Sequence, residues 1–471
     1  MKENIIDGSA SAITTLVSDH KDRKEPASVL TLVDAIALIV GIVIGAGIFR
    51  APSLVAANSD SEAMFLIAWL AGGIVSLVGA LCYAELTTAF PNTGGDYHFI
   101  RRAFGKQTAF LFAWARLSVI QTGSIALLAF IFGDYASRIL SLGEYSSVIY
   151  AAMAVISLTA INIIGITFGT GTQKLLTAVE VSGILIVIAA GFFLAPADAG
   201  LTVAEPGVGG SNSSAGLAMV IVLLTFGGWN EAAYISAELR SGKRQLAKAL
   251  IISIVLITAI YVLVNMAYLN VLGLRNMAAS EAVAVDLMEA TVGQNGVVLI
   301  GLLVAVSALT SANATIFTGA RTNYAFGRDF PVLTKLSQWN FRKSAPVNAF
   351  LVQGAISLAL VSLGLITRSG FEAMLEYTAP VFWFFFLLVG ISLFVLRRKE
   401  PDAERPFRVP LYPVTPLIFC LMSAYLLYSS VVYTGLGALV GIAVLLAGAI
   451  LLVVVRRGAS LGFRHKQTRI R

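Results

Sequence analysis

The chain has 471 residues, of which 57% are hydrophobic and only 13% are charged, and its net charge is +7. Soluble domains carry about 25% charged residues, so this composition excludes an ordinary soluble protein and indicates an integral membrane protein. Cys82 and Cys420 both lie in apolar stretches, which excludes a disulfide framework. His20, His98 and His465 lie in polar tails or near a loop, so we expect no metal site, no cofactor and no enzyme.

Residues 1–27 are polar and show no signal-peptide pattern, and we expect a cytoplasmic tail there. A membrane-spanning helix needs about 20 apolar residues, and twelve later stretches meet that requirement. They cover residues 29–56, 64–90, 108–133, 146–166, 173–195, 215–239, 247–273, 296–320, 347–366, 372–396, 412–432 and 435–456. The sequence therefore predicts an all-α membrane protein with a transmembrane domain over residues 28–456 and a second cytoplasmic tail over residues 457–471.

The positions of Lys and Arg predict the orientation. With the N-terminus inside, the outer loops hold only Arg50, Arg138, Arg275 and Arg368, whereas the inner segments and the C-terminal tail are rich in basic residues. This asymmetry follows the positive-inside rule, so we expect both termini in the cytoplasm and the protein in the plasma (inner) membrane. The basic charge then reflects topology and does not indicate nucleic-acid binding.

Glycines interrupt the first and the sixth of these stretches. Gly41, Gly45 and Gly47 lie in the first, and the segment 225–230 of the sixth contains Gly227 and Gly228. Glycine weakens a helix interior by roughly 1 kcal/mol relative to alanine. Unwound backbone at membrane depth is tolerated where it lines a cavity, and matched breaks in two halves of a chain are typical of a transporter's binding site. The alternative is that these glycines only let helices pack closely.

The positions of the two breaks predict an inverted repeat. Because each half has five spans, an odd number, residues 29–195 and 215–396 would enter the membrane from opposite sides, with the substrate at their interface. The last two spans, over residues 412–456, fall outside the repeat.

Five local motifs resemble those of one transporter superfamily, in the same order along the chain. They are Ile44-Gly45-Ala46-Gly47-Ile48-Phe49 with Pro52, Tyr83-Ala84-Glu85-Leu86 with Gly94-Gly95-Asp96-Tyr97, Phe226-Gly227-Gly228-Trp229-Asn230-Glu231, Gly319-Ala320-Arg321 with Ala325-Phe326-Gly327-Arg328-Asp329, and Arg405-Pro406-Phe407-Arg408-Val409-Pro410. The sequence thus resembles the amino acid–polyamine–organocation superfamily, and most closely its L-type and bacterial amino acid permeases. The resemblance implies twelve transmembrane helices in a LeuT-type 5+5 fold and transport of amino acids by alternating access.

An amino acid needs hydrogen-bond donors for its carboxylate and acceptors for its ammonium group. Free N–H groups at the start of a broken helix's second half suit the carboxylate, which places it near Ala46 and Gly47, beside Gly45. The first half of each broken helix ends in free carbonyl groups, which suit the ammonium group. In the first span these belong to Val43 and Ile44. In the sixth span they belong to Leu224, Thr225 and Gly227, beside Gly228. No acidic side chain lies in either break, so we expect a neutral substrate. By family position Phe226 and Trp229 are gates, although helix packing is an alternative for Trp229.

Ionisable residues inside a membrane indicate functional sites. Glu180 occupies a place in the fifth span where many members of the superfamily carry a lysine that stands in for a sodium ion. The reversed charge suggests instead that Glu180 takes a proton or helps hold a cation such as Na⁺, to which Thr310 and Ser311 could add hydroxyl oxygens. The alternative is a structural ion pair with Arg116 or Lys174.

Arg116 lies roughly 14 Å into the third span, at 1.5 Å per residue, and needs an acidic partner there. Glu85, Glu231 and Glu238 fall toward the same cytoplasmic half, so we expect an intramembrane charge network that either locks an inner gate or serves the scaffold.

The sequence thus predicts a secondary amino acid transporter, working as an exchanger or as a proton-coupled symporter. A polyamine or organocation carrier and a transporter-fold substrate sensor are the alternatives. Animal L-type light chains carry a cysteine after the third span that links them to a heavy subunit. Residues 134–145 contain none, so we expect no covalent heavy subunit.

Overall fold

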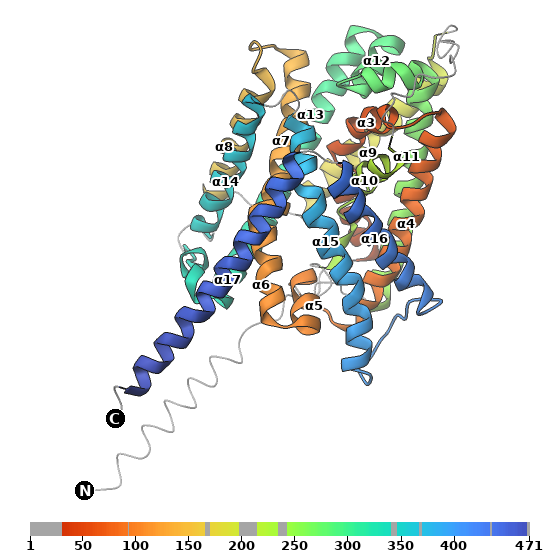
Figure 1. Ribbon diagram of the computed structural model, residues 1–471. Helices are drawn as coiled ribbons and strands as arrows, with labels where there is room; N and C mark the ends of the chain where they lie inside the picture. Colours follow the sequence, from red (N-terminus) through yellow and green to blue (C-terminus); the bar gives the residue numbers. More distant parts are fainter. Residues whose placement is uncertain are drawn as a thin grey trace, which may run out of the picture.

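The computed structural model describes residues 31–92, 94–164, 170–196, 214–233, 243–340, 346–366, 370–433 and 436–468. Within these ranges the chain forms a bundle of helices (Figure 1). The helices are α2 (Leu32–Val43), α3 (Ala51–Ala57), α4 (Glu62–Ala89), α5 (Gly95–Phe104), α6 (Lys106–Ala115), α7 (Gln121–Ile139), α8 (Ser146–Ile164), α9 (Thr170–Phe193), α10 (Ala215–Thr225), α11 (Lys243–Ala279), α12 (Val283–Val292), α13 (Gln294–Asp329), α14 (Val347–Ser362), α15 (Gly370–Lys399), α16 (Val414–Tyr433) and α17 (Leu436–Thr468). The all-α prediction is confirmed for the described part of the chain.

Nine described helical segments are long and apolar enough to cross a membrane, and the bent pair α2–α3 makes a tenth candidate. The other two predicted spans fall on α9 and α17, whose described apolar parts, Thr177–Phe193 and Gly437–Val453, are shorter. The structure thus supports nine or ten spans by length, while the count of twelve and the 5+5 repeat remain predictions.

The first span is broken where the glycines predict. Helix α2 ends at Val43, a short 3₁₀ helix, η1, covers Ala46–Phe49, and α3 then continues at a bend of 55°. Pro52 lies in the first turn of α3, where its missing N–H costs no hydrogen bond.

The sixth span is broken as well. Helix α10 ends at Thr225, and Gly228 has φ +112°, a left-handed conformation that favours glycine. The 3₁₀ helix η3 (Trp229–Ala233) follows.

The third span contains a π-helical turn, η2 (Arg116–Ile120), between α6 and α7. The N–H of Gln121 donates to the carbonyl of Arg116, five residues earlier. The side-chain amide of Gln121 donates to the carbonyl of Thr315 on α13 at 2.7 Å, so this turn is tied to a neighbouring helix.

Glycines also bring the helices together closely. A Cβ atom at Gly41 would lie 2.0 Å from Thr177 Oγ1 on α9, and one at Gly72 would lie 2.3 Å from Val222 Cγ1 on α10. The alternative role of these glycines, close packing of helices, is therefore confirmed for Gly41. The helix also breaks nearby, so the two interpretations hold together.

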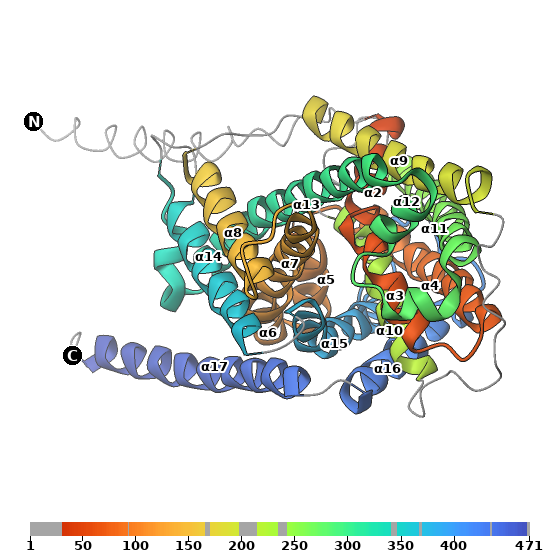
Figure 2. The same cartoon turned by 90° about the horizontal axis from the view of Figure 1, so that it is seen from above.

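The ends of the bundle are covered by short helices. Helix α12 lies at one end and α5 at the opposite end (Figure 1). Seen from above, α17 runs along the outside of the bundle (Figure 2). Residues of both breaks, such as Ile44 and Phe226, are buried inside the bundle.

Candidate functional site

The two breaks lie against each other. A Cβ atom at Gly228 would lie 2.9 Å from Ile42 Cγ2 and 3.2 Å from the carbonyl oxygen of Ile42. A Cβ atom at Gly47 would lie 3.6 Å from Thr225 Cγ2. The structure thus brings together the two segments that the sequence analysis assigned to one site.

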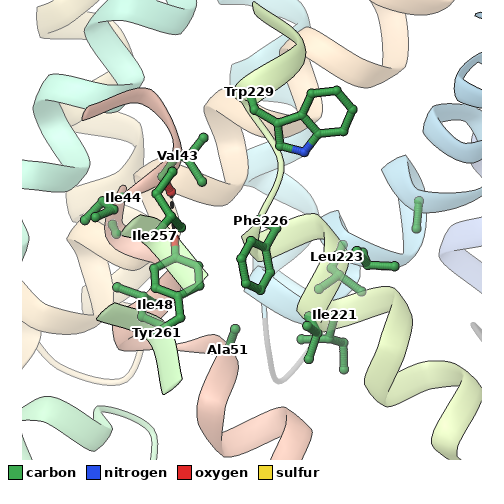
Figure 3. Packing of buried hydrophobic residues seen from close by; sticks show 14 of the residues in the cluster. Val43, Ile44, Ile48, Ala51, Ile221, Leu223, Phe226, Trp229, Ile257 and Tyr261 are labelled. Atoms are coloured by element: carbon green, nitrogen blue, oxygen red, sulfur yellow. Dashed lines mark hydrogen bonds between the residues drawn. The ribbon is translucent and has the colours of Figure 1, made fainter. Parts of the chain in front are cut away.

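A tyrosine on α11 connects the two breaks. The hydroxyl of Tyr261 lies 2.8 Å from the carbonyl oxygen of Val43 (Figure 3). It also lies 3.2 Å from the carbonyl oxygen of Thr225. Its ring is fully buried. The sequence analysis missed this residue, because a single hydroxyl in an apolar stretch gives no indication of which main-chain groups it reaches.

Some of the predicted acceptors are used within the breaks themselves. The carbonyl of Val43 also accepts the N–H of Gly45 at 2.8 Å, and the carbonyl of Leu224 accepts the N–H of Gly227 at 3.0 Å. The N–H of Ile44 donates to Val40 at 2.7 Å. A carbonyl oxygen has two lone pairs, so the N–H of Gly45 and the hydroxyl of Tyr261 together use the acceptor capacity of Val43. The carbonyl of Thr225 faces the Tyr261 hydroxyl at 3.2 Å and keeps a lone pair for a further donor.

The two predicted gate residues lie in aromatic clusters. The ring centroids of Phe226 and Tyr261 lie 4.9 Å apart. The ring centroid of Trp229 lies 5.1 Å from that of Tyr83 and 5.5 Å from that of Phe386. Both side chains are buried. Packing is therefore shown for both residues, and gating remains a prediction.

Glu180 is buried on α9 at 5% exposure, and neither carboxylate oxygen has a hydrogen-bond partner among the described residues. The Ser307 hydroxyl lies beside the carboxylate without forming a well-aligned bond. The alternative partner Arg116 pairs elsewhere, with Glu231, and the side chain of Lys174 lies outside the described residues.

Two hydroxyls predicted near Glu180 differ in where they point. Ser311 on α13 faces the first break, because its Oγ lies 3.2 Å from the position of a Cβ at Gly45. The hydroxyl of Thr310 donates to the carbonyl of Val306 in its own helix at 2.8 Å. Among the described residues no group of three His, Cys, Asp or Glu could hold a metal ion. A lone carboxylate beside hydroxyls can take up a proton or share a monovalent cation.

The predicted charge network consists of separate parts. Arg116 pairs with Glu231 at 3.1 Å and 3.2 Å, as expected. Glu85 does not contact this pair. Its carboxylate is bound by two other arginines and by a main-chain N–H group. Glu238 lies outside the described residues.

The carboxylate of Glu85 is 2% exposed and accepts two hydrogen bonds from Arg397, at 2.7 Å and 2.5 Å. It also accepts the N–H of Val409 at 2.7 Å and lies 3.5 Å from Arg405. Glu85 therefore joins α4 to the end of α15 and to the loop after it.

Arg50, assigned to an outer loop, is buried at the start of α3. It donates to the carbonyl of Ser280 at 3.0 Å and lies 3.9 Å from the carboxylate of Glu372. Its guanidinium also lies over the ring of Phe371 at 5.9 Å. Arg50 thus joins α3 to the segment before α12 and to the start of α15.

Known proteins match this chain along most of its length. The family model described as amino acid permease matches residues 30–455. The b(0,+)-type amino acid transporter 1 of Mus musculus is 33% identical over 409 residues, which is 85% of this chain and 82% of that protein. Its Homo sapiens counterpart is 32% identical over 410 residues, 86% and 82% of the two chains. The large neutral amino acids transporter small subunit 2 of Mus musculus is 31% identical over 430 residues, 88% and 79% of the two chains.

Proposed function

The chain belongs to the amino acid permease family of the amino acid–polyamine–organocation superfamily, and from this we propose that it moves neutral amino acids across the plasma membrane by alternating access. The observation that carries the proposal is the bond of Tyr261 to the carbonyls of Val43 and Thr225. It joins main-chain acceptors of both broken helices at one point inside an apolar bundle. Discontinuous helices that meet in this way form substrate sites in secondary transporters.

Main-chain groups would recognise the part that all amino acids share. We infer that the carboxylate binds near the N–H groups of Ala46 and Gly47, because the first N–H groups of a helix lack partners within that helix. The ammonium group would then face the carbonyls of Ile44 and Thr225, while that of Val43 is held by Gly45 and Tyr261. The absence of acidic side chains in both breaks favours a neutral substrate over a polyamine.

We propose that Glu180 couples transport to a proton or to a monovalent cation. Its burial supports this, as does the lack of a hydrogen bond to either oxygen from the described residues, because an ionised carboxylate without a partner is costly there. A bound proton or cation would remove that cost. The second candidate mechanism is exchange of amino acids without a coupled ion, in which Glu180 stays protonated during the whole transport cycle.

The name of one relative, a small subunit, says that it assembles with another chain. For this chain we propose transport without a covalently linked heavy subunit, because residues 134–145 contain no cysteine. We also propose cytoplasmic termini, twelve spans and the 5+5 repeat, on the distribution of basic residues and the positions of the two breaks.

The decisive experiment is uptake of radiolabelled amino acids into proteoliposomes that are preloaded with the same unlabelled compound. We expect accumulation of neutral amino acids, blocked by excess unlabelled substrate. Uptake of polyamines alone would replace the proposal with an organocation carrier. Specific binding without movement into the vesicles would indicate a sensor.

A further inference from the structure

A third ionisable group, the carboxyl group of Asp96, lies beside the Arg116–Glu231 pair. Asp96 is the second residue of α5 and is 4% exposed, although α5 is a short helix at the end of the bundle (Figure 1). This end is the one that the basic residues predict to be cytoplasmic. Exposed loop helices seldom bury an aspartate, since a buried carboxylate must be paired or neutral.

The groups that face Asp96 come from three other elements. Tyr83 on α4 and Asn230 on η3 place their polar side chains at the carboxyl group, while Arg116 of η2 and Glu231 of η3 act on it through their charges. One oxygen, Oδ1, has no hydrogen-bond partner among the described residues.

Helices α6, α13 and α15 also contact α5. The charged residue of α6 is Lys106 at its start, and Asp329 at the end of α13 pairs with Arg101 at 2.8 Å. The charged groups of α15 contact the far end of α5. Lys399 donates to the carbonyl of Ala103 at 2.7 Å, and Arg102 pairs with Glu400 at 2.5 Å. Of the described charged groups, only Arg116 and Glu231 act directly on Asp96.

The charges of this cluster do not balance when all three groups are ionised. Two carboxylates then share one guanidinium, which leaves an excess negative charge in a buried place. Burial raises the pKa of Asp96 from 3.8 to about 7, Arg116 opposes this rise and Glu231 adds to it. One added proton makes the cluster neutral.

We propose that Asp96, Arg116 and Glu231 form a proton-binding site on the cytoplasmic side, in which the protonation of Asp96 sets how firmly η3 is held. The site itself does not require the chain to be a transporter, and only its effect on transport rests on the proposed function.

The mechanism follows from the sharing of one arginine. With Asp96 neutral, Glu231 is the one ionised carboxylate of this three-residue cluster, and its pair with Arg116 holds η3, which follows the break of the sixth span, against the third span. When Asp96 gives its proton to cytoplasmic water, its carboxylate competes with Glu231 for Arg116. An alkaline cytoplasmic side therefore loosens η3 and favours opening of the inner end, and an acidic one keeps that end closed.

The first test is a pH titration of the full chain in lipid nanodiscs by infrared difference spectroscopy, which detects the C=O stretch of a protonated carboxyl group. We expect a band that titrates near neutral pH, that disappears in Asp96→Asn and that persists in the control Glu180→Gln. Persistence of the same titration in a folded Asp96→Asn protein would overturn the proposal.

Substitution of two neighbouring residues should shift the titration midpoint of Asp96 in opposite directions, which a purely structural role of Asp96 would not produce. Glu231→Gln removes a like charge and should lower the midpoint by about one pH unit or more, and Arg116→Gln removes the compensating charge and should raise it. Shifts in the same direction, or none, would contradict the shared-arginine site. Thermal unfolding of each variant verifies that it is folded.

A second measurement links the site to transport. Proteoliposomes of known orientation are assayed for exchange of L-leucine and L-alanine while the pH is varied on one face at a time. We expect the rate to rise from pH 6 to pH 8 on the cytoplasmic face only, and this dependence to be lost in Asp96→Asn. If the wild type transports neither compound, the proposed function fails while the infrared titration still decides the proton site. An unchanged pH profile in a transporting Asp96→Asn protein would refute the link between protonation and η3.

Discussion

The hydroxyl of Tyr261 lies 2.8 Å from the carbonyl oxygen of Val43, so a side chain of α11 is bonded to the end of the first half-helix. The same oxygen lies 3.2 Å from the carbonyl of Thr225 at the end of α10. One side chain therefore fixes the separation of the two main-chain segments between which we place the substrate.

Replacing Tyr261 with Phe tests this arrangement. The ring packing is retained, but two buried carbonyls lose their shared donor. Such a loss costs about 1–3 kcal/mol, so we expect KM for neutral amino acids to rise about tenfold in proteoliposomes. Tyr268→Phe is the matched control, because that hydroxyl is buried on the same helix and bonds to none of the residues that the structure describes. Equal KM changes in the two variants would contradict a specific role of Tyr261.

Gly228→Ala tests the contact between the breaks. The added Cβ would meet Ile42 at 2.9 Å, and the backbone would stay in a left-handed conformation. We expect transport to be lost. Gly143→Ala is the control, with φ +104° but no atom within 4 Å of the added Cβ. It adds the backbone strain alone, on the order of 1 kcal/mol, and should leave the transport rate nearly unchanged.

Glu180→Gln mimics the protonated side chain. If Glu180 carries the coupled proton, accumulation driven by a pH gradient should vanish while exchange at equal concentrations persists. If it holds Na⁺, the stimulation of uptake by sodium should vanish instead, and Thr310→Val should weaken it as well. Uptake with unchanged pH and sodium dependence would eliminate both roles. The measurement is uptake of labelled amino acid under each imposed gradient.

Glu85→Gln leaves Arg397 and Arg405 without their buried partner. Removal of one member of a buried ion pair typically costs about 3–5 kcal/mol, so we expect a marked loss of thermal stability. Glu400→Gln breaks an exposed pair with Arg102 and should cost about 1 kcal/mol or less. Thermal unfolding in nanodiscs compares the two. A similar small effect of both variants would mean that Glu85 contributes little to the scaffold.

The raised pKa of Asp96 predicts how stability depends on pH. Between about pH 4 and 7 the unfolded chain releases this proton while the folded protein keeps it, so the free energy of unfolding falls as pH rises. Asp96→Asn removes this contribution and should raise Tm relative to the wild type at pH 8, with a smaller difference at pH 4. A Tm difference for Asp96→Asn that does not grow with pH would contradict the assignment.

The sequence predicted the features that depend on local composition. The apolar stretches correspond to helices, and the glycines of residues 41–47 and 227–228 lie where both helices break, since weak helix propensity is a local property. The resemblance to amino acid permeases, carried by short motifs, is confirmed by the match over residues 30–455.

The partners of buried polar side chains were harder to predict. Glu85 was grouped with Arg116, but it binds Arg397, which is 312 residues away in the sequence. Arg50 was assigned to an outer loop and is buried. Which charges pair is decided by tertiary packing, and periodicity within one helix contains no information about that.

The π turn at Arg116–Ile120 changes the angular phase of the third span. In a regular α-helix each residue turns by about 100°, so residues 116 and 121 would point about 140° apart. The turn closes with a bond from residue 121 to residue 116, so these two positions lie closer to one face than they would in a regular α-helix. Arg116 thereby reaches Glu231 while Gln121 reaches Thr315. Deleting one residue from this turn would restore a uniform helix and rotate all of α7 relative to α6, so this single extra residue sets the rotational alignment of the two halves of the third span.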